Sequence, residues 1–231
     1  SSDLRTEELP MKCNYKIVLF DLDGTLCESG EGILNSAKYA IREMGFPVPP
    51  PEVMRKFIGP PMGQSMRNFC GMSQEQAEKA VALYRQRYNR IGWRENRLYP
   101  GIEALLKDLK ASGAKLSTAS SKPKPILEHI VQAYDIRTYF DALVAAGPDG
   151  FHSSKPEMIA QAIRECGGAE KREVVMIGDT HFDARGAVEA GVDFLAAAYG
   201  YGTKEELAEA GAVWFADSVD ALRPYLFSNE N

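Results

Sequence analysis

The chain has 231 residues, of which 45% are hydrophobic and 26% are charged, and its formal net charge is −5. This length suits one large domain, or one domain with a smaller insert, in an ordinary globular protein. The acidic balance argues against a nucleic-acid polymer or an anionic membrane as a general partner, because both require a basic surface. The four cysteines are scattered and form no C-x-x-C pair, which favours free thiols in a reducing compartment.

No apolar stretch approaches the ~20 residues needed to span a bilayer, so we expect a cytoplasmic protein. Residues 1–10 are polar and precede a plausible start at Met11; we interpret them as a disordered leader or an added extension. Residues 16–20 consist of a lysine and four apolar residues, and they predict a buried strand.

A long helical pattern follows this strand. Apolar residues recur at helical spacing over 33–44, and further helices are expected over 52–57, 62–70 and 73–91. We therefore predict an all-helical insert, residues 28–97, after the first strand. The segments that join it to the rest would hold it above the end of the sheet, as a lid.

From residue 98 onward, helical and strand patterns alternate. Helices are expected over 102–112, 124–134, 156–166, 182–190, 204–210 and 219–226, and strands over 114–119, 142–146, 174–177, 194–197 and 213–215. Such alternation predicts βαβ units and a parallel sheet covered by helices on both faces. The predicted fold class is therefore α/β, with a core formed by residues 11–27 and 98–231.

Two acidic clusters follow two of the predicted strands. Asp21 and Asp23 come directly after residues 16–20, and Asp179 and Asp183 come after residues 174–177. Ligand sites of open α/β sheets lie at the carboxyl ends of the strands. If the first strand continues through Asp23, its period of two puts both carboxylates on one side. A spacing of four on a helix would likewise put Asp179 and Asp183 on one face.

Four carboxylates at one edge form an oxygen-rich site that suits Mg²⁺. One carboxylate at a strand end can attack phosphorus to form an aspartyl-phosphate, and a second can donate a proton and later activate water. Each cluster also has a purely structural interpretation: a turn at residues 21–24, and acidic residues favoured by a helix dipole at residues 179–183.

Ser120 and Lys155 are further candidates at the same edge. Ser120 ends a predicted strand, where a hydroxyl can hold a phosphoryl oxygen. Lys155 opens a helix, where its ammonium would offset the carboxylates and bind a phosphate. Taken alone, the serine is equally typical of a helix N-cap and the lysine of a solvated surface.

Together these segments resemble the haloacid dehalogenase superfamily, in its phosphoglycolate-phosphatase-like branch with a helical cap. The resemblance rests on the motif DLDGTL at residues 21–26, on Ser120, on Lys155, and on Gly178-Asp179 followed by Asp183, in this order around a helical insert. Residues 198–202 also resemble members of that branch described as 5′-nucleotidases. The resemblance implies a Rossmann-like parallel sheet core with an inserted all-helical cap.

The resemblance also implies a role for each site residue. Asp21 would be the nucleophile and a Mg²⁺ ligand, and Asp23 would be the general acid and base, giving its backbone carbonyl to the metal. Ser120 and Lys155 would bind the phosphoryl group. Asp179 would be a metal ligand, and Asp183 would support the metal directly or through water. Many relatives carry Thr-Asn where this chain has Ser-Ser at residues 120–121, so one amide contact is lost.

The function expected from these features is Mg²⁺-dependent hydrolysis of a small phosphorylated metabolite, phosphoglycolate-phosphatase-like or 5′-nucleotidase-like. The alternatives are a pyrophosphatase, a sugar-phosphate mutase, and a catalytically silent regulatory module. Such mutases often carry a histidine just beyond the first motif, whereas residues 27–35 contain none, which favours water as the acceptor. The oligomeric state is not readable from the sequence.

Overall fold

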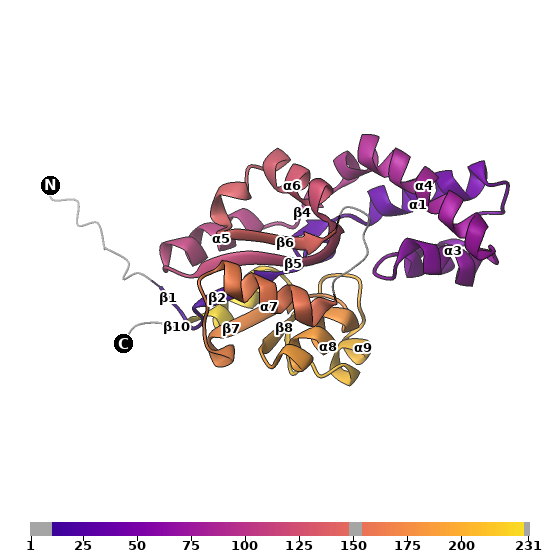
Figure 1. Ribbon diagram of the computed structural model, residues 1–231. Coiled ribbons are helices and arrows are strands. Elements are labelled where there is room, and N and C mark those ends of the chain that lie inside the picture. The colour runs from indigo at the N-terminus through magenta and orange to yellow at the C-terminus, as the bar shows by residue number, and fades with distance from the viewer. Residues whose placement is uncertain (1–10, 148–153, 229–231) are drawn as a thin grey trace, which may run out of the picture.

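The centre of the molecule is a parallel sheet (Figure 1). The computed structural model describes residues 11–147 and 154–228, so the predicted leader at residues 1–10 lies outside the described residues. The sheet has six strands in the order β6-β5-β2-β7-β8-β9, and each neighbouring pair is parallel. The strands are β2 (Ile17–Phe20), β5 (Lys115–Pro123), β6 (Ala142–Ala146), β7 (Val174–Gly178), β8 (Asp193–Ala197) and β9 (Trp214–Ala216). The predicted α/β class is confirmed.

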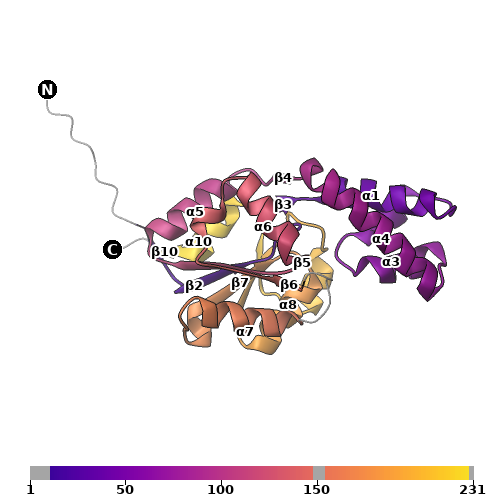
Figure 2. The same ribbon diagram turned by 45° about the horizontal axis from the view of Figure 1, so that its top comes forward.

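Helices cover both faces of this sheet (Figure 2). One face carries α5 (Ile102–Ala111), α6 (Lys124–Ala133) and α10 (Arg223–Leu226), and the other carries α7 (Lys155–Glu165), α8 (His181–Ala190) and α9 (Lys204–Glu209). Side chains of the central strand alternate between the two layers: Val18 and Phe20 pack toward α5, and Ile17 and Leu19 toward α7. All four are fully buried, as expected for a central parallel strand.

A separate helical unit, Gly30 to Glu95, lies beside the sheet at one end of the molecule (Figures 1 and 2). It consists of α1 (Gly30–Glu43), α2 (Pro51–Met54), the 3₁₀ helix η1 (Arg55–Phe57), α3 (Met62–Cys70), α4 (Gln74–Arg90) and the 3₁₀ helix η2 (Gly92–Glu95). Its own apolar core includes Ile41, Met54 and Met66. Two short antiparallel strands, β3 (Cys27–Glu28) and β4 (Arg97–Leu98), join it to the sheet.

Several strand boundaries differ from the prediction by a residue or more, and two of them, in β5 and β8, bear on the argument. β5 continues to Pro123, and its pairing with β6 shifts register between Ser120 and Pro123, which makes its end irregular. β8 begins at Asp193, one residue before the strand predicted over 194–197. The Tyr15 hydroxyl donates to Asp193 Oδ2 at 2.8 Å, so that carboxylate has a partner inside the strand layer.

The remaining short elements close the ends of the sheet. β1 (Lys12–Cys13) pairs antiparallel with β10 (Phe227–Ser228). The 3₁₀ helices η3 (Arg137–Tyr139), η4 (Lys171–Glu173) and η5 (Asp220–Leu222) connect other elements. Among the helices of the described ranges, none combines the length and the apolar character needed to cross a membrane.

An ion-pair cluster fixes the start of β6. The carboxylate of Asp141 accepts hydrogen bonds from Lys110 Nζ at 2.8 Å, from Lys115 Nζ at 3.1 Å and from the Leu116 amide at 2.9 Å. Burial by itself would raise the pKa of Asp141, but these hydrogen bonds lower it below its ordinary value. The ionised side chain therefore contributes to stability.

Candidate active site

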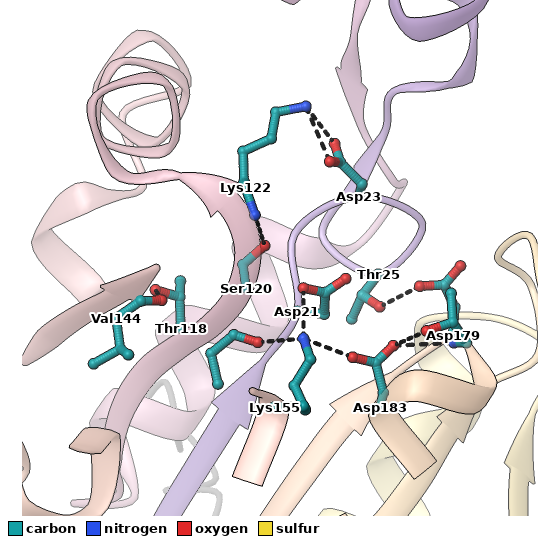
Figure 3. A network of polar contacts seen from close by, with 12 residues as sticks. Asp21, Asp23, Thr25, Thr118, Ser120, Lys122, Val144, Lys155, Asp179 and Asp183 are labelled. Carbon is teal, nitrogen blue, oxygen red and sulfur yellow. Dashed lines mark hydrogen bonds and ion pairs between the residues drawn. The ribbon is translucent and has the colours of Figure 1, made fainter. Parts of the chain in front are cut away.

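Pairing of β2 with β7 brings the two acidic clusters together. Phe20 lies opposite Ile177 in the register, and the Asp21 amide continues the ladder by donating to the Ile177 carbonyl at 2.9 Å. Carboxylate oxygens of Asp21, Asp179 and Asp183 consequently lie within 4.8 Å of one another, and all three residues are buried (Figure 3). The edge of a parallel sheet, rather than proximity in sequence, creates this cluster.

Lys155 lies between the carboxylates. Its Nζ is 3.2 Å from Asp21 Oδ1 and 2.8 Å from Asp183 Oδ1, and it donates to the Ala119 carbonyl at 2.7 Å. These contacts use all three N–H donors of the ammonium. Close packing of α8 fixes the lysine stem, because a Cβ at Gly186 would lie 2.4 Å from Lys155 Cγ. The structure thus places Lys155 beside Asp21, as the sequence predicted.

The cluster holds more negative charge than Lys155 can offset. Burial raises the pKa of Asp21, and repulsion from Asp183 and Asp23 adds to the rise, while Lys155 opposes it. Burial, followed by repulsion from Asp183 and Asp21, raises the pKa of Asp179 well above its ordinary value. Burial alone would lower the pKa of Lys155, but the two carboxylates that contact it raise it. An excess of buried anionic oxygen ligands fits a hard divalent cation.

Asp179 is fixed by the loops on either side of it. The Thr25 hydroxyl donates to Asp179 Oδ1 at 3.2 Å, and the Tyr201 amide donates to Oδ2 at 2.8 Å. Gly24 has a φ of +82°, and a Cβ there would lie 2.0 Å from Asp179 Oδ2; one at Gly200 would lie 2.3 Å from Asp179 Cβ. Both positions therefore need glycine for the loops to close around this carboxylate.

Asp183 belongs to the first turn of α8. Thr180 is the N-cap, and its amide and hydroxyl donate to Asp183 Oδ2 at 3.0 and 2.7 Å. Asp179 precedes the helix, which begins at His181. The expectation that Asp179 and Asp183 share a helix face is therefore wrong, and the turn between strand and helix is what brings them together.

Asp23 is not part of the carboxylate cluster. β2 ends at Phe20, so the strand does not continue through Asp23 as we had considered. The Asp23 carboxylate instead faces Lys122, whose Nζ lies 2.9 and 3.1 Å from its two oxygens (Figure 3). Each aspartate of the first motif thus has its own lysine. The predicted metal contact of Asp23 concerns its backbone carbonyl and stays a prediction.

Ser120 lies at the same edge and is buried. Its Oγ accepts a hydrogen bond from the Lys122 amide at 3.2 Å, and hydrogen bonding of its hydroxyl to Asp21 favours the ionised carboxylate. The structure therefore brings Asp21, Ser120 and Lys155 to one place. Their chemical roles remain proposals.

Four side chains at or near the site received no role in the sequence analysis. They are Thr25, Tyr88, Lys122 and Tyr201. Lys122 was detectable, because it follows Ser120 by two residues at a strand end, where its ammonium can offset carboxylates at the same edge as Lys155 does. Tyr88 gave no signal, since a tyrosine on an amphipathic helix is usually a packing residue.

Comparisons with known proteins agree with this geometry. The family model described as haloacid dehalogenase-like hydrolase matches residues 18–197. A 5′-nucleotidase from Pseudomonas aeruginosa is 34% identical, over 93% of this chain and 97% of that protein. Tyrosine-protein kinase PtkA of Mycobacterium tuberculosis is 35% identical, over 91% of this chain and 72% of that protein.

Solved structures give the same result. The crystal structure of a predicted phosphatase from Clostridium acetobutylicum has a TM-score of 0.83 and 38% sequence identity, over 90% of this chain and 96% of that chain. The matched residues of the family model include the carboxylate cluster, Ser120 and Lys155. These similarities confirm the predicted enzyme class, a phosphoric monoester hydrolase. The chain therefore belongs to the family of haloacid dehalogenase-like hydrolases.

Proposed function

We propose that this protein is a Mg²⁺-dependent phosphatase that hydrolyses a small phosphomonoester through an aspartyl-phosphate on Asp21. The observation that carries the proposal is the position of the Asp21 carboxylate, 3.2 Å from the Lys155 ammonium and inside a cluster of three buried carboxylates. A buried nucleophile beside a cation can approach an anionic phosphate without prohibitive repulsion.

In the first step, an Asp21 oxygen attacks phosphorus, the bond to the leaving oxygen breaks, and Asp23 donates a proton to that oxygen. In the second step, ionised Asp23 accepts a proton from water as the water attacks phosphorus. The acyl-phosphate bond then breaks, which releases phosphate and restores the Asp21 carboxylate. Ser120 and Lys155 would bind the phosphoryl oxygens. Because all three Lys155 donors have partners, a phosphoryl oxygen must replace or share one of them, and the longest contact is the one to Asp21.

Mg²⁺ would be held by Asp21, Asp179 and the backbone carbonyl of Asp23, with Asp183 contributing directly or through water. When bound, it would supply positive charge that neutralises the carboxylates and the transferred phosphoryl group. The protein's own contribution is a rigid, oxygen-only ligand set. Thr25 and the Tyr201 amide fix the direction of Asp179, and Thr180 fixes that of Asp183.

We further propose that residues 28–97 are a cap inserted into a core formed by residues 11–27 and 98–231. The helical unit has its own apolar core and is joined to the sheet by the β3–β4 pair. The Gly30 amide of α1 donates to the Tyr201 hydroxyl at 2.6 Å, and the backbone amide of the same tyrosine donates to Asp179. A cap in this position would exclude bulk water from the reaction.

The test is phosphate release from a panel of phosphorylated metabolites, with Mg²⁺ or with EDTA. The panel should contain nucleoside monophosphates, phosphoglycolate, sugar phosphates and pyrophosphate, because the chemistry of the cluster does not select among them. We expect release that requires Mg²⁺ and is reduced by at least 10³-fold in Asp21→Asn, since the amide cannot act as the nucleophile.

Two controls make this experiment decisive. Asp135→Asn removes an exposed carboxylate that is not among the site residues and should leave turnover unchanged. An alcohol acceptor added to the reaction separates transfer from hydrolysis, since a mutase-like enzyme would form a phosphorylated acceptor. Equal turnover by the wild type and Asp21→Asn would refute the proposed nucleophile.

A further inference from the structure

A buried polar path connects the helical unit to Asp23. Lys122 lies on the irregular end of β5, and its side chain is only 6% exposed. Its Nζ, which contacts both Asp23 oxygens, also donates to the Tyr88 hydroxyl at 2.7 Å and lies 4.1 Å from the centroid of that ring. Tyr88 belongs to α4. One ammonium therefore contacts both the proposed acid–base residue and a helix of the proposed cap.

The path continues from Tyr88 to the segment where the chain returns to the sheet. The Tyr88 hydroxyl also accepts a hydrogen bond from Asn96 Nδ2 at 2.9 Å, and Asn96 lies between η2 and β4. The Asn96 carbonyl in turn accepts a hydrogen bond from the Tyr134 hydroxyl at the end of α6. Tyr88 is thus held at a fixed place relative to the sheet when the helical unit is seated as in this structure.

We propose that Lys122 and Tyr88 are positioning residues that aim the Asp23 carboxylate at the leaving oxygen when the helical unit is seated against the sheet. The inference rests on the proposed phosphatase function and on the role of Asp23 within it. Lys122 fixes the carboxylate through two short contacts, and Tyr88 fixes Lys122 through a hydrogen bond and its ring face. Hydrogen bonds to charged groups are among the stronger and more directional ones in proteins.

Asp23 and Lys122 both have flexible side chains that need a partner to hold one position. Asp23 follows the end of β2, and 23% of its side chain is exposed, so the backbone alone leaves its carboxylate free to rotate. Lys122 has a long, flexible stem that needs a second partner to hold one position. Misplacement of a proton donor by about 1 Å costs rate rather than substrate binding. The expected signature is a loss in kcat without a matching change in KM.

The experiment compares five variants of the complete chain: Tyr88→Phe, Asp23→Ala, the double variant of these two, Lys122→Met, and Tyr84→Phe. Tyr84 is the matched control, because its ring stacks on Tyr88 at 5.6 Å, whereas the hydrogen bond from Lys122 goes to the Tyr88 hydroxyl. Each is assayed with p-nitrophenyl phosphate, which has a good leaving group, and with an alkyl phosphate, whose poor leaving group requires protonation.

We expect Tyr88→Phe to lower kcat for the alkyl phosphate about tenfold, equivalent to ~1.4 kcal/mol. With p-nitrophenyl phosphate, kcat of Tyr88→Phe should change by less than about twofold. Tyr84→Phe should change kcat by less than about twofold with either substrate. Because Tyr88 acts through Asp23, the double variant should be no slower than Asp23→Ala. Lys122→Met should show the same dependence on the leaving group as Tyr88→Phe.

An equal loss for both substrates would overturn the proposal, as would losses that add up in the double variant or a matching effect of Tyr84→Phe. These results differ from a failure of the proposed function itself. In that case the wild type would release no phosphate from any substrate. Circular dichroism and melting of each variant identify any that fails to fold, and the conservative Tyr88→Phe change keeps the test available if Lys122→Met does so.

Discussion

The lysine within the carboxylate cluster offers a direct test of the electrostatics of the site. In Lys155→Met, the side chain keeps much of its length but loses the ammonium that contacts Asp21 and Asp183. The lysine side chain is 7% exposed, and those of Asp21 and Asp183 are 12% and 1% exposed, so solvent cannot replace the lost charge. Removing one partner of such a buried pair destabilises a protein by about 3–5 kcal/mol. For a chain of this size that corresponds to a fall of roughly 6–20 °C in the melting temperature.

The assay is thermal and urea unfolding of both proteins, with EDTA and with Mg²⁺. The loss of stability in Lys155→Met should be largest in EDTA. Mg²⁺ should stabilise the variant more than the wild type, because the carboxylate cluster of the variant carries one more uncompensated negative charge. Mg²⁺ at a concentration 100 times its dissociation constant adds about 2.7 kcal/mol to the free energy of unfolding. Lys115→Met is the control; its lysine is 51% exposed, so less than about 1 kcal/mol should be lost. Equal losses in the two variants, or an identical response to Mg²⁺ in Lys155→Met and wild type, would refute this reasoning.

Two further predictions concern the loop around the cluster and the corner of the sheet. Gly24→Ala forces a non-glycine residue to a φ of +82° and puts its Cβ 2.0 Å from an Asp179 oxygen. We expect the backbone strain alone to lower the free energy of unfolding by about 1–3 kcal/mol, measured by urea unfolding. We also expect the variant to need more Mg²⁺ for activity, measured by Mg²⁺ titration. Wild-type Mg²⁺ dependence in that variant would contradict the assigned packing. Asp141→Asn should lower the free energy of unfolding by only about 1 kcal/mol at pH 7, because solvent screens the partly exposed ion pairs of Asp141 with Lys110 and Lys115. The lowered pKa of Asp141 means that this contribution exists above the unfolded pKa of about 3.9 and is lost as the pH falls through the folded pKa. Urea midpoints of wild type and variant should therefore converge under acidic conditions; a constant gap down to pH 2 would contradict this.

Much of the fold was predictable because its signals are local. The apolar runs of β2, β6 and β7 are strands buried on both faces, and such strands read as continuous hydrophobic segments. Helix starts were equally clear where side chains cap them, as Ser73 does for α4 through a capping box with Gln76. Strand–helix alternation then determined the parallel arrangement, and that arrangement determined which residues share an edge.

The direction of individual side chains was not predictable in the same way. Phe57, an apolar residue next to a turn, packs against Phe69 within the helical unit and is 1% exposed. Whether an apolar residue next to a turn packs inward or faces a ligand depends on neighbours distant in sequence. The same limit applies to Asp193, whose place in β8 depends on Tyr15, a residue 178 positions away.

The class of fold, the family resemblance, and the aspartates and Lys155 of the site could be predicted without a structure, because each follows from residue type and spacing along one segment. The partners of those residues, in contrast, depend on how the whole chain folds. The tertiary structure paired Asp21 with Lys155 and Asp23 with Lys122, and it brought Tyr88 from a helix of the inserted unit to the second lysine. Such pairings depend on where the ends of separate strands and helices meet in space, and no local pattern encodes that meeting point.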